Sequence, residues 1–298
     1  MSSSLATLRT SLRQREDIHI IAALTAVTAW GVGPIFNKSM TVSSSTIVFY
    51  RMAFGVPIMV TMSFLNGGRI TRELIRKTAL PGILFGLSMI TGFASIKLTS
   101  IANATLVTTL QPVLVLFVAP KMFGERLTGQ KILYSLTAMV GVLIVVLAAA
   151  STSGAHLSGD LLAVANVVIW TTYFVLAKVR RLDGVHSWAF LAVVFMWAAV
   201  VAMPFGAITS RDLGAMTAKD WWFIAFMAIG PGVVGHGLMT WSQSHIDVSL
   251  ASLLGLLSPV VSAVLAWTIL HQTLAPLQLL GGVVVLCSIA LLLRVQNT

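Results

Sequence analysis

The chain has 298 residues, of which 57% are hydrophobic and 9% are charged, and its formal net charge at pH 7 is +10. A soluble domain carries roughly 25% charged residues, so this composition excludes a water-soluble enzyme or binding module. Most of the basic residues lie between or at the ends of long apolar stretches, where such residues report membrane topology. We therefore expect a lipid bilayer as the surroundings of the chain and no nucleic acid as a partner.

Ten apolar stretches follow a polar segment, residues 1–18, which is predicted to be a cytoplasmic tail. Each stretch is about 19–23 residues long, the length at which a helix crosses a hydrocarbon core about 30 Å thick. Helices are expected because a helix satisfies its backbone hydrogen bonds within one segment. The sequence thus predicts an all-α integral membrane protein with ten transmembrane helices, numbered one to ten, at about residues 19–40, 45–65, 79–97, 101–122, 130–150, 159–179, 187–208, 220–241, 248–270 and 275–294.

The two halves of the chain repeat one pattern. Helix one carries a tryptophan and, toward its end, a lysine (Trp30 and Lys38), and helix six repeats this pair (Trp170 and Lys178). Such a duplication is typical of transporters built from paired repeats. Each repeat holds an odd number of helices, so the second copy enters the membrane from the opposite side. We predict two inverted five-helix repeats around a central cavity, at residues 19–150 and 151–298.

Basic residues are distributed unequally between the two sides of the predicted membrane. Most of the 19 lysines and arginines fall on the side where the chain begins and ends. By the positive-inside rule, this bias places both termini in the cytoplasm. We expect a multi-pass protein of the cell inner (cytoplasmic) membrane.

Two tryptophans and one arginine are candidates for the lining of a substrate cavity. Trp30 and Trp170 fall near the middle of their helices, although tryptophan prefers the membrane interfaces. They either line a cavity, with a flat apolar surface and one N–H donor each, or pack in the protein interior. Arg51 lies inside helix two, and an ionisable residue within a membrane span is a functional candidate. It either binds a substrate carboxylate or bridges the ends of neighbouring helices.

Helices four and nine carry prolines at matching positions, Pro112 and Pro259. A proline inside a helix removes an amide donor and bends the helix, and paired interruptions in two halves point to a transport site. Thr105 and Thr108 share a helix face with Pro112, and Ser252 shares one with Pro259. We predict that the prolines are hinges and that the hydroxyl residues line the cavity. The alternative is that they are ordinary features of membrane helices, with hydroxyls bonded to their own backbone.

Helix eight contains the most irregular run of the chain, Gly230 to Gly237, which includes His236. Glycines weaken a helix and permit unwinding or a close approach of the backbone. His236 either responds to protons, because histidine titrates near neutrality, or is a hydrogen-bonded side chain packed among the glycines.

These features resemble the drug/metabolite transporter superfamily, and within it the EamA type. The resemblance covers about residues 19–294, and within the superfamily the chain is most similar to amino-acid exporters of the YddG type. The motifs that carry it are Trp30 and Gly31 with Lys38, then Phe49, Tyr50 and Arg51 at the start of helix two, and a mid-helix proline followed by Gly124 and Glu125.

The second half departs from the family pattern, because it lacks Gly-Glu at residues 271–272 and has no arginine in helix seven. The resemblance implies a central cavity walled by helices one to four and six to nine. It also implies that helices five and ten are peripheral.

We expect a membrane transporter that exports amino acids, including aromatic ones, or facilitates their movement by alternating access. A multidrug or other small-metabolite exporter is the alternative, and an integral-membrane enzyme or receptor is a distant one. None of the nine acidic residues falls at mid-membrane depth, so we expect no buried proton relay. The histidines are scattered and Cys287 is single, so no catalytic residues, metal ion or cofactor are expected.

Overall fold

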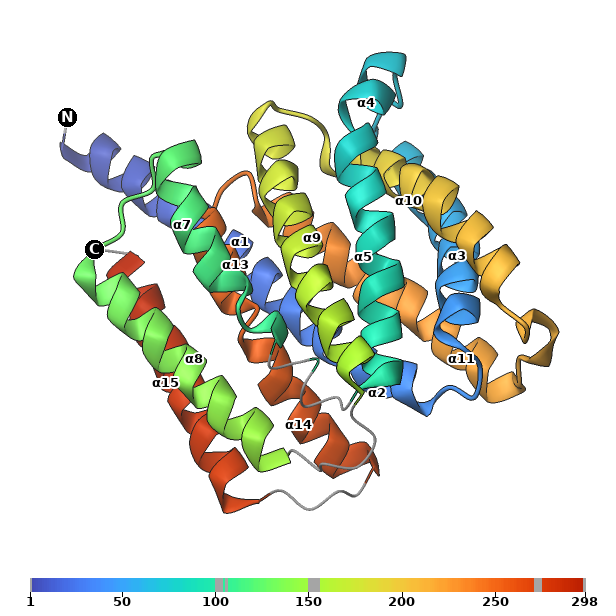
Figure 1. Ribbon diagram of the computed structural model, residues 1–298. Helices are drawn as coiled ribbons and strands as arrows, with labels where there is room; N and C mark the ends of the chain where they lie inside the picture. The colour runs from blue at the N-terminus through green and yellow to red at the C-terminus, as the bar shows by residue number, and fades with distance from the viewer. Residues whose placement is uncertain (1, 100–103, 105–106, 150–155, 271–274, 297–298) are drawn as a thin grey trace.

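A computed structural model describes the chain except for residues 1, 100–103, 105–106, 150–155, 271–274 and 297–298 (Figure 1). Within the described residues every regular element is a helix, and 9 helical segments are long and apolar enough to cross a membrane. A shorter apolar helix, α7 (Gln111–Phe123), lies where helix four is expected, and part of that span falls outside the described residues. This architecture confirms the predicted all-α integral membrane fold.

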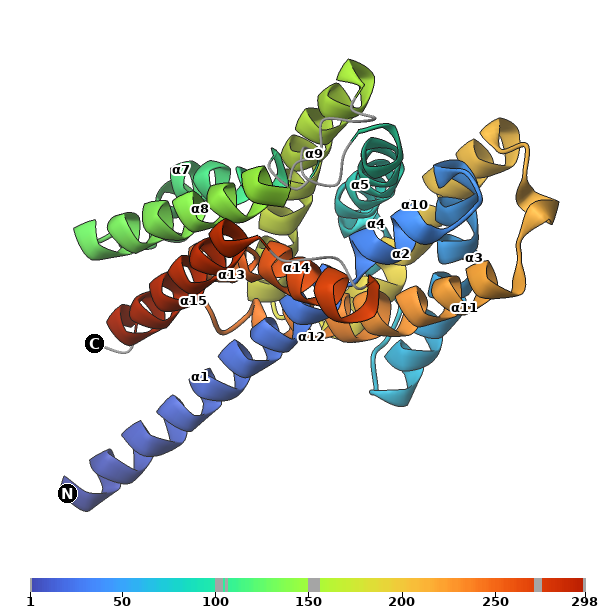
Figure 2. The same cartoon turned by 90° about the horizontal axis from the view of Figure 1, so that it is seen from below.

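The first half begins with α1 (Ser2–Gly31) and α2 (Gly33–Ser39), which together form helix one. The residues predicted as a tail form the first turns of α1, which projects away from the other helices (Figure 2). The following elements are α3 (Ser44–Leu65) as helix two, the short α4 (Arg72–Lys77), α5 (Ala79–Leu98) as helix three, α7 in helix four, and α8 (Gly129–Ala149) as helix five.

The second half follows the same order. Helix six is α9 (Leu157–Leu182), helix seven is α10 (Ser187–Thr209), and a short 3-10 turn η1 (Leu213–Ala215) comes next. Helix eight consists of α11 (Ala218–Met227), η2 (Ala228–His236) and α12 (Gly237–Ser242), helix nine of α13 (Val248–Leu254) and α14 (Leu257–Leu270), and helix ten of α15 (Pro276–Gln296).

Side chains at the helix ends explain several of these boundaries. Ser43 accepts a hydrogen bond from the backbone N–H of Thr46 and caps α3. Thr217 and Asp220 form a reciprocal capping box at the start of α11, which satisfies two amide donors that the first turn leaves free. Gly124 ends α7 with a φ of 66°, a left-handed conformation that glycine adopts without steric cost.

Helices one, four, eight and nine are interrupted near their middles. Helix one breaks at Val32, and Pro34 opens the next segment. Helix nine breaks after Leu254, where i to i+3 hydrogen bonds replace helical ones just before Pro259. In helix four the described helix starts at Gln111, directly before Pro112. The predicted irregularity of helix eight is confirmed, because η2 is a π-helix.

Helices of the two halves pair across the molecule. Helix two packs against helix seven (α3 with α10), and helix five packs against helix ten (α8 with α15). Helix three packs against helix six, and helix one packs against helix eight. A two-fold relation between the halves produces this exchange of partners. Figures 1 and 2 both show α8 and α15 side by side at one edge, where the resemblance placed helices five and ten.

The bundle has two ends that differ in chemistry. We call the end where α1 begins and α15 finishes the terminal end; it is the upper end in Figure 1 and carries the loops after α3, α7, α9 and α12. We call the other end, with the loops after α2 and α10, the opposite end. Which end faces the cytoplasm stays a prediction.

Candidate functional site

A cavity of about 250 Å³ lies at the centre of the bundle, where the interrupted helices meet. Helices one to four, six, eight and nine contribute to its wall. Thr105 lies outside the described residues, and all the other predicted site and hinge residues line the cavity: Trp30, Arg51, Thr108, Pro112, Trp170, His236, Ser252 and Pro259.

The two symmetry-related tryptophans meet edge to face in the middle of this cavity wall. The ring centroids of Trp30 and Trp170 are 5.7 Å apart at an interplanar angle of 83°. They therefore pack against each other and also face the cavity, so the two alternatives offered by the sequence describe one arrangement. The indole Nε1 of Trp30 is buried and has no hydrogen-bond partner among the described residues.

Arg51 places a cation in the wall of the cavity. The residue is only 6% exposed, and its guanidinium lies 4.9 Å from the ring centroid of Phe93. Within the described part of the chain, no carboxylate or hydrogen-bond acceptor pairs with it. The bridge between neighbouring helix ends that the sequence allowed is therefore not formed. A buried charge without a partner is costly, so Arg51 is available to an anionic group that enters the cavity.

His236 sits in the π-helix η2 against aromatic rings. Its ring centroid is 5.3 Å from that of Trp30 and 5.0 Å from that of Phe85. Its packing among rings differs from the hydrogen-bonded arrangement offered by the sequence, because no hydrogen bond joins it to another described residue. The π-helix lets the backbone of Gly235 approach Trp30 so closely that an added Cβ would lie 2.5 Å from its Nε1.

The sequence did not single out three polar residues that line the cavity. Asn37 is fully buried, and its Oδ1 has no hydrogen-bond partner in the described residues, while its Nδ2 donates to the carbonyl of Phe93 at 3.4 Å. Ser88 donates to Oδ1 of Asn166 at 2.8 Å. Asn37 and Asn166 could have been found in the sequence, because each is an amide side chain inside an apolar span. Asn37 also lies between Trp30 and Lys38 of the repeated pattern.

Helix one and helix nine touch where both are broken. The hydroxyl of Ser262 donates to the carbonyl of Gly31. A Cβ on Gly31 would lie 2.9 Å from the carbonyl oxygen of Ser258, so only glycine permits this approach. The break in helix one therefore packs against the helical turn that contains Pro259.

Polar contacts between the halves, and within the second half, join the helices at the terminal end of the cavity. The carboxylate of Glu125 accepts hydrogen bonds from the backbone N–H groups of Val248 (2.6 Å) and Ser249 (3.2 Å), at the start of α13. Lys178 is buried and donates to the carbonyl of Ile246 at 2.7 Å. These contacts hold helices four, six and nine together at the terminal end of the cavity.

Comparison with known proteins gives a family. The model of the EamA-like transporter family matches residues 17–147 and 157–294. The uncharacterized transporter YyaM of Bacillus subtilis is 27% identical over 267 residues, which cover 83% of each chain.

Other relatives are exporters. The aromatic amino acid exporter YddG of Ancylobacter novellus is 30% identical over 178 residues, 58% of this chain and 60% of that one. The pseudopaline exporter CntI of Pseudomonas aeruginosa is 23% identical over 269 residues, 88% of this chain and 90% of that one. A solved crystal structure with 20% sequence identity has a TM-score of 0.72 and covers 93% of this chain and 97% of its own, which shows a shared fold.

Proposed function

The chain belongs to the EamA-like transporter family of the drug/metabolite transporter superfamily, and on this premise we propose that it exports amino acids or facilitates their movement across the cell inner membrane. The proposed topology has both termini and residues 1–18 in the cytoplasm. The proposed repeats are residues 19–150 and 151–298. Transport proceeds by alternating access, with the cavity open to one side at a time.

The unpartnered cation of Arg51 carries this proposal. A substrate carboxylate would pair with its guanidinium, and charge-assisted hydrogen bonds of this kind are strong and directional. The free Oδ1 of Asn37 would accept from the substrate ammonium. Phe93 contacts both residues, through its carbonyl and through its ring, so the two polar groups lie on one side of the cavity.

The aromatic wall supports a broad range of side chains. Trp30 and Trp170 offer flat apolar surface next to the polar side of the cavity. Aromatic surfaces contribute binding through area and ring geometry without demanding one shape of partner. A zwitterion would thus be held by its main-chain groups, while its side chain lies against the indole rings.

The size of the cavity separates this proposal from its alternative. Sites for drug-sized ligands occupy roughly 300–1,000 Å³. The cavity of about 250 Å³ is smaller and fits a small metabolite in this conformation. A multidrug exporter is the second candidate, and transport of bulky organic cations in preference to amino acids would favour it.

A paired substrate assay tests the role of Arg51. Purified protein in liposomes is offered an amino acid and the amine that results when its carboxylate is removed. The unmodified protein should prefer the amino acid, and Arg51→Gln should lose that preference by roughly tenfold or more, since a hydrogen bond to a charged group contributes about 1.5–3 kcal/mol.

Arg211→Gln is the matched control, because Arg211 lies exposed in the loop after α10. It should leave the preference unchanged. Equal transport of the acid and the amine by the unmodified protein would contradict an amino-acid substrate.

A further inference from the structure

A second hollow, of about 470 Å³, lies at the terminal end of the bundle. It is formed by the ends of helices two, six and eight and by the start of helix seven, and it shares no lining residue with the central cavity. We call it the terminal-end pocket. Its polar and aromatic lining includes Asn66, Arg181, His186, Ser187, Trp241 and Ser244.

Arg181 brings a fixed positive charge to this pocket. Its Nε donates to the carbonyl of Thr240 at 2.9 Å, and its Nη2 donates to Oγ of Ser244 at 3.3 Å. These bonds set the plane of the guanidinium. No carboxylate among the described residues forms an ion pair with it.

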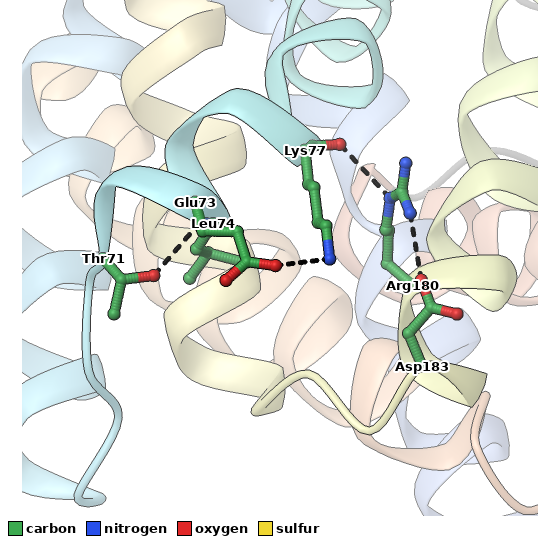
Figure 3. A network of polar contacts seen from close by, with 6 residues as sticks. All are labelled: Thr71, Glu73, Leu74, Lys77, Arg180 and Asp183. Atoms are coloured by element: carbon green, nitrogen blue, oxygen red, sulfur yellow. Dashed lines mark hydrogen bonds and ion pairs between the residues drawn. The ribbon is translucent and has the colours of Figure 1, made fainter.

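The acidic residues of the neighbouring segments are engaged elsewhere. Figure 3 shows Glu73 paired with Lys77 and Asp183 paired with Arg180. The N–O distances of these ion pairs are 2.6 Å and 2.9 Å. Arg180 also donates through Nε to the carbonyl of Lys77 at 3.2 Å, which ties α9 to α4. The charge of Arg181 is therefore left uncompensated beside this network.

The start of α10 adds hydrogen-bond donors without acceptors. His186 precedes the helix and makes no capping hydrogen bond with its side chain. Ser187 lines the pocket, is only 5% exposed, and its hydroxyl has no partner among the described residues. The first turn of a helix has free N–H groups and a partial positive charge, which together favour an anion.

The start of α3, at the opposite end, is the structural equivalent of the start of α10. Helix two is the counterpart of helix seven, and the carboxylate of Asp212 lies at its start, bound to the capping residue Ser43. That carboxylate accepts from the backbone N–H of Ser43 at 2.6 Å and from the Ser43 hydroxyl at 2.7 Å. The chain thus supplies an anion to the start of α3, and at the start of α10 it leaves a pocket with an arginine that forms no ion pair among the described residues.

We propose that the terminal-end pocket binds a phosphate group. Arg181 donates within the protein through Nε and Nη2, so its Nη1 and the second Nη2 hydrogen are the donors left for phosphate oxygens. Ser187 and the first N–H groups of α10 supply further donors. Trp241 forms part of the wall, and tryptophan at a helix end is typical of the headgroup region of a membrane. The favoured source is the headgroup of a phospholipid in the adjoining leaflet, and free phosphate is the other source of the same chemistry.

A thermal-shift experiment on the purified full-length protein in detergent distinguishes these sources. The probes are phosphatidylglycerol, a diacylglycerol with the same chains and no phosphate, and inorganic phosphate. Phosphatidylglycerol should raise the melting temperature by about 2–4 °C, a linkage effect of roughly 1 kcal/mol in a chain of this size, and diacylglycerol should not.

An equal shift with inorganic phosphate would identify free phosphate as the ligand. No shift with either phosphate probe, or equal shifts with both lipids, would overturn the proposal.

Variants locate the binding. Arg181→Gln should weaken the apparent affinity for phosphatidylglycerol roughly tenfold, as expected for a lost charge-assisted hydrogen bond. Arg180→Gln is the matched control and should bind as the unmodified protein does, because Arg180 is already paired with Asp183. Unchanged affinity in Arg181→Gln would overturn the proposal.

A second variant, His186→Asp, tests binding at the start of α10 even if Arg181→Gln does not fold. His186→Asp places a carboxylate at the start of α10, as Asp212 does for α3, and aspartate is a preferred residue at this position. It should raise the melting temperature without lipid and abolish the shift with phosphatidylglycerol. A full shift in this variant would contradict binding at the start of α10.

Discussion

The two ends of the bundle are built from equivalent helices, yet different carboxylates hold them. At the terminal end, Glu125 joins the loop after helix four to the start of helix nine. At the opposite end, Asp212 in the loop after helix seven accepts from Ser43, and Asp220 in the first turn of helix eight accepts from Thr41, both in the loop after helix one. Duplication therefore preserved the helices while the polar contacts diverged, and the two ends need not open with equal ease.

The two lysines of the repeated pattern, Lys38 and Lys178, make equivalent contacts in the two halves. Lys38 donates to the carbonyls of Ile96 (3.0 Å) and Thr99 (3.1 Å), at the end of helix three. Lys178 donates to Ile246, which follows helix eight, the counterpart of helix three. Both cations thus compensate the negative end of a neighbouring helix. Because these contacts are alike at both ends, the carboxylates are the better place to separate the two ends by mutation.

The largest effect is expected at the terminal end. Glu125→Gln removes the negative charge that accepts two backbone N–H groups of α13 and should weaken the closure by about 1.5–3 kcal/mol. In a Cys287→Ser background, a cysteine at Ser252 should then react with a thiol reagent from the terminal end roughly tenfold faster or more.

Glu73→Gln is the matched control for this closure. Glu73 also lies at the terminal end, but it is an exposed partner of Lys77, and such exposed pairs contribute little to stability. Its labelling rate should match that of the parent. Equal rates in Glu125→Gln and Glu73→Gln would show that Glu125 does not hold the cavity shut.

The contact at the opposite end should respond to acid. Burial alone would raise the pKa of Asp212, but hydrogen bonds from Thr46, Ser43 and Ser210 outweigh it and lower the pKa to about 2 from its ordinary 3.8. The folded pKa is depressed, so the stabilisation is present above about pH 4 and is lost as the pH falls toward 2.

Asp212→Asn should remove most of this pH dependence. The carboxamide keeps the shape and loses the charge, so at pH 7 the variant should be less stable by about 1–2 kcal/mol, after allowance for solvent screening. Melting temperatures measured in detergent from pH 7 to pH 3 check the expectation. An unchanged acid slope in the variant would assign the slope to another group.

Much of the fold could be predicted because membrane spans have a fixed length and an apolar composition. The prediction for helix nine, 248–270, coincides with Val248–Leu270, and that for helix three ends one residue before Leu98. The meeting of Trp30 and Trp170 is likewise an outcome of the duplication, since a two-fold axis through the cavity brings equivalent residues together.

The contacts that close the two ends could not be predicted in the same way. Asp212 and Ser43 are 169 residues apart, and neither carries a local pattern that names the other. Asn37 was overlooked because one amide in an apolar span is a weak signal until its burial is known. The break at Val32 was not predicted, although Pro34 two residues later is favoured at the start of a helical segment.

A smaller effect is expected from the prolines between the two ends. Pro112→Ala or Pro259→Ala restores an amide donor, so opening the helix at that point would cost about 1 kcal/mol more and slow transport roughly fivefold. Both variants should fold and reach the membrane as the parent does. Tracer flux into liposomes measures the rate, and unchanged flux in the double variant would reduce both residues to ordinary kinks.

The smallest expected effect is that of a proton gradient on transport. The carboxylates described above form contacts at the ends of the bundle and not in its middle. Among the described residues that line the central cavity there is no aspartate or glutamate, and a proton relay through a membrane usually needs one. A tracer amino acid should therefore equilibrate into liposomes at equal pH on both sides. An imposed gradient should leave the final level unchanged.

Accumulation of a neutral amino acid driven by a proton gradient alone would contradict this expectation. His236 would then be the first residue to replace, since it is buried at the cavity wall and histidine can exchange a proton near neutrality. His236→Gln should abolish the coupling in that case while transport down a concentration gradient persists. Coupling that survives this variant would place the proton on the substrate itself.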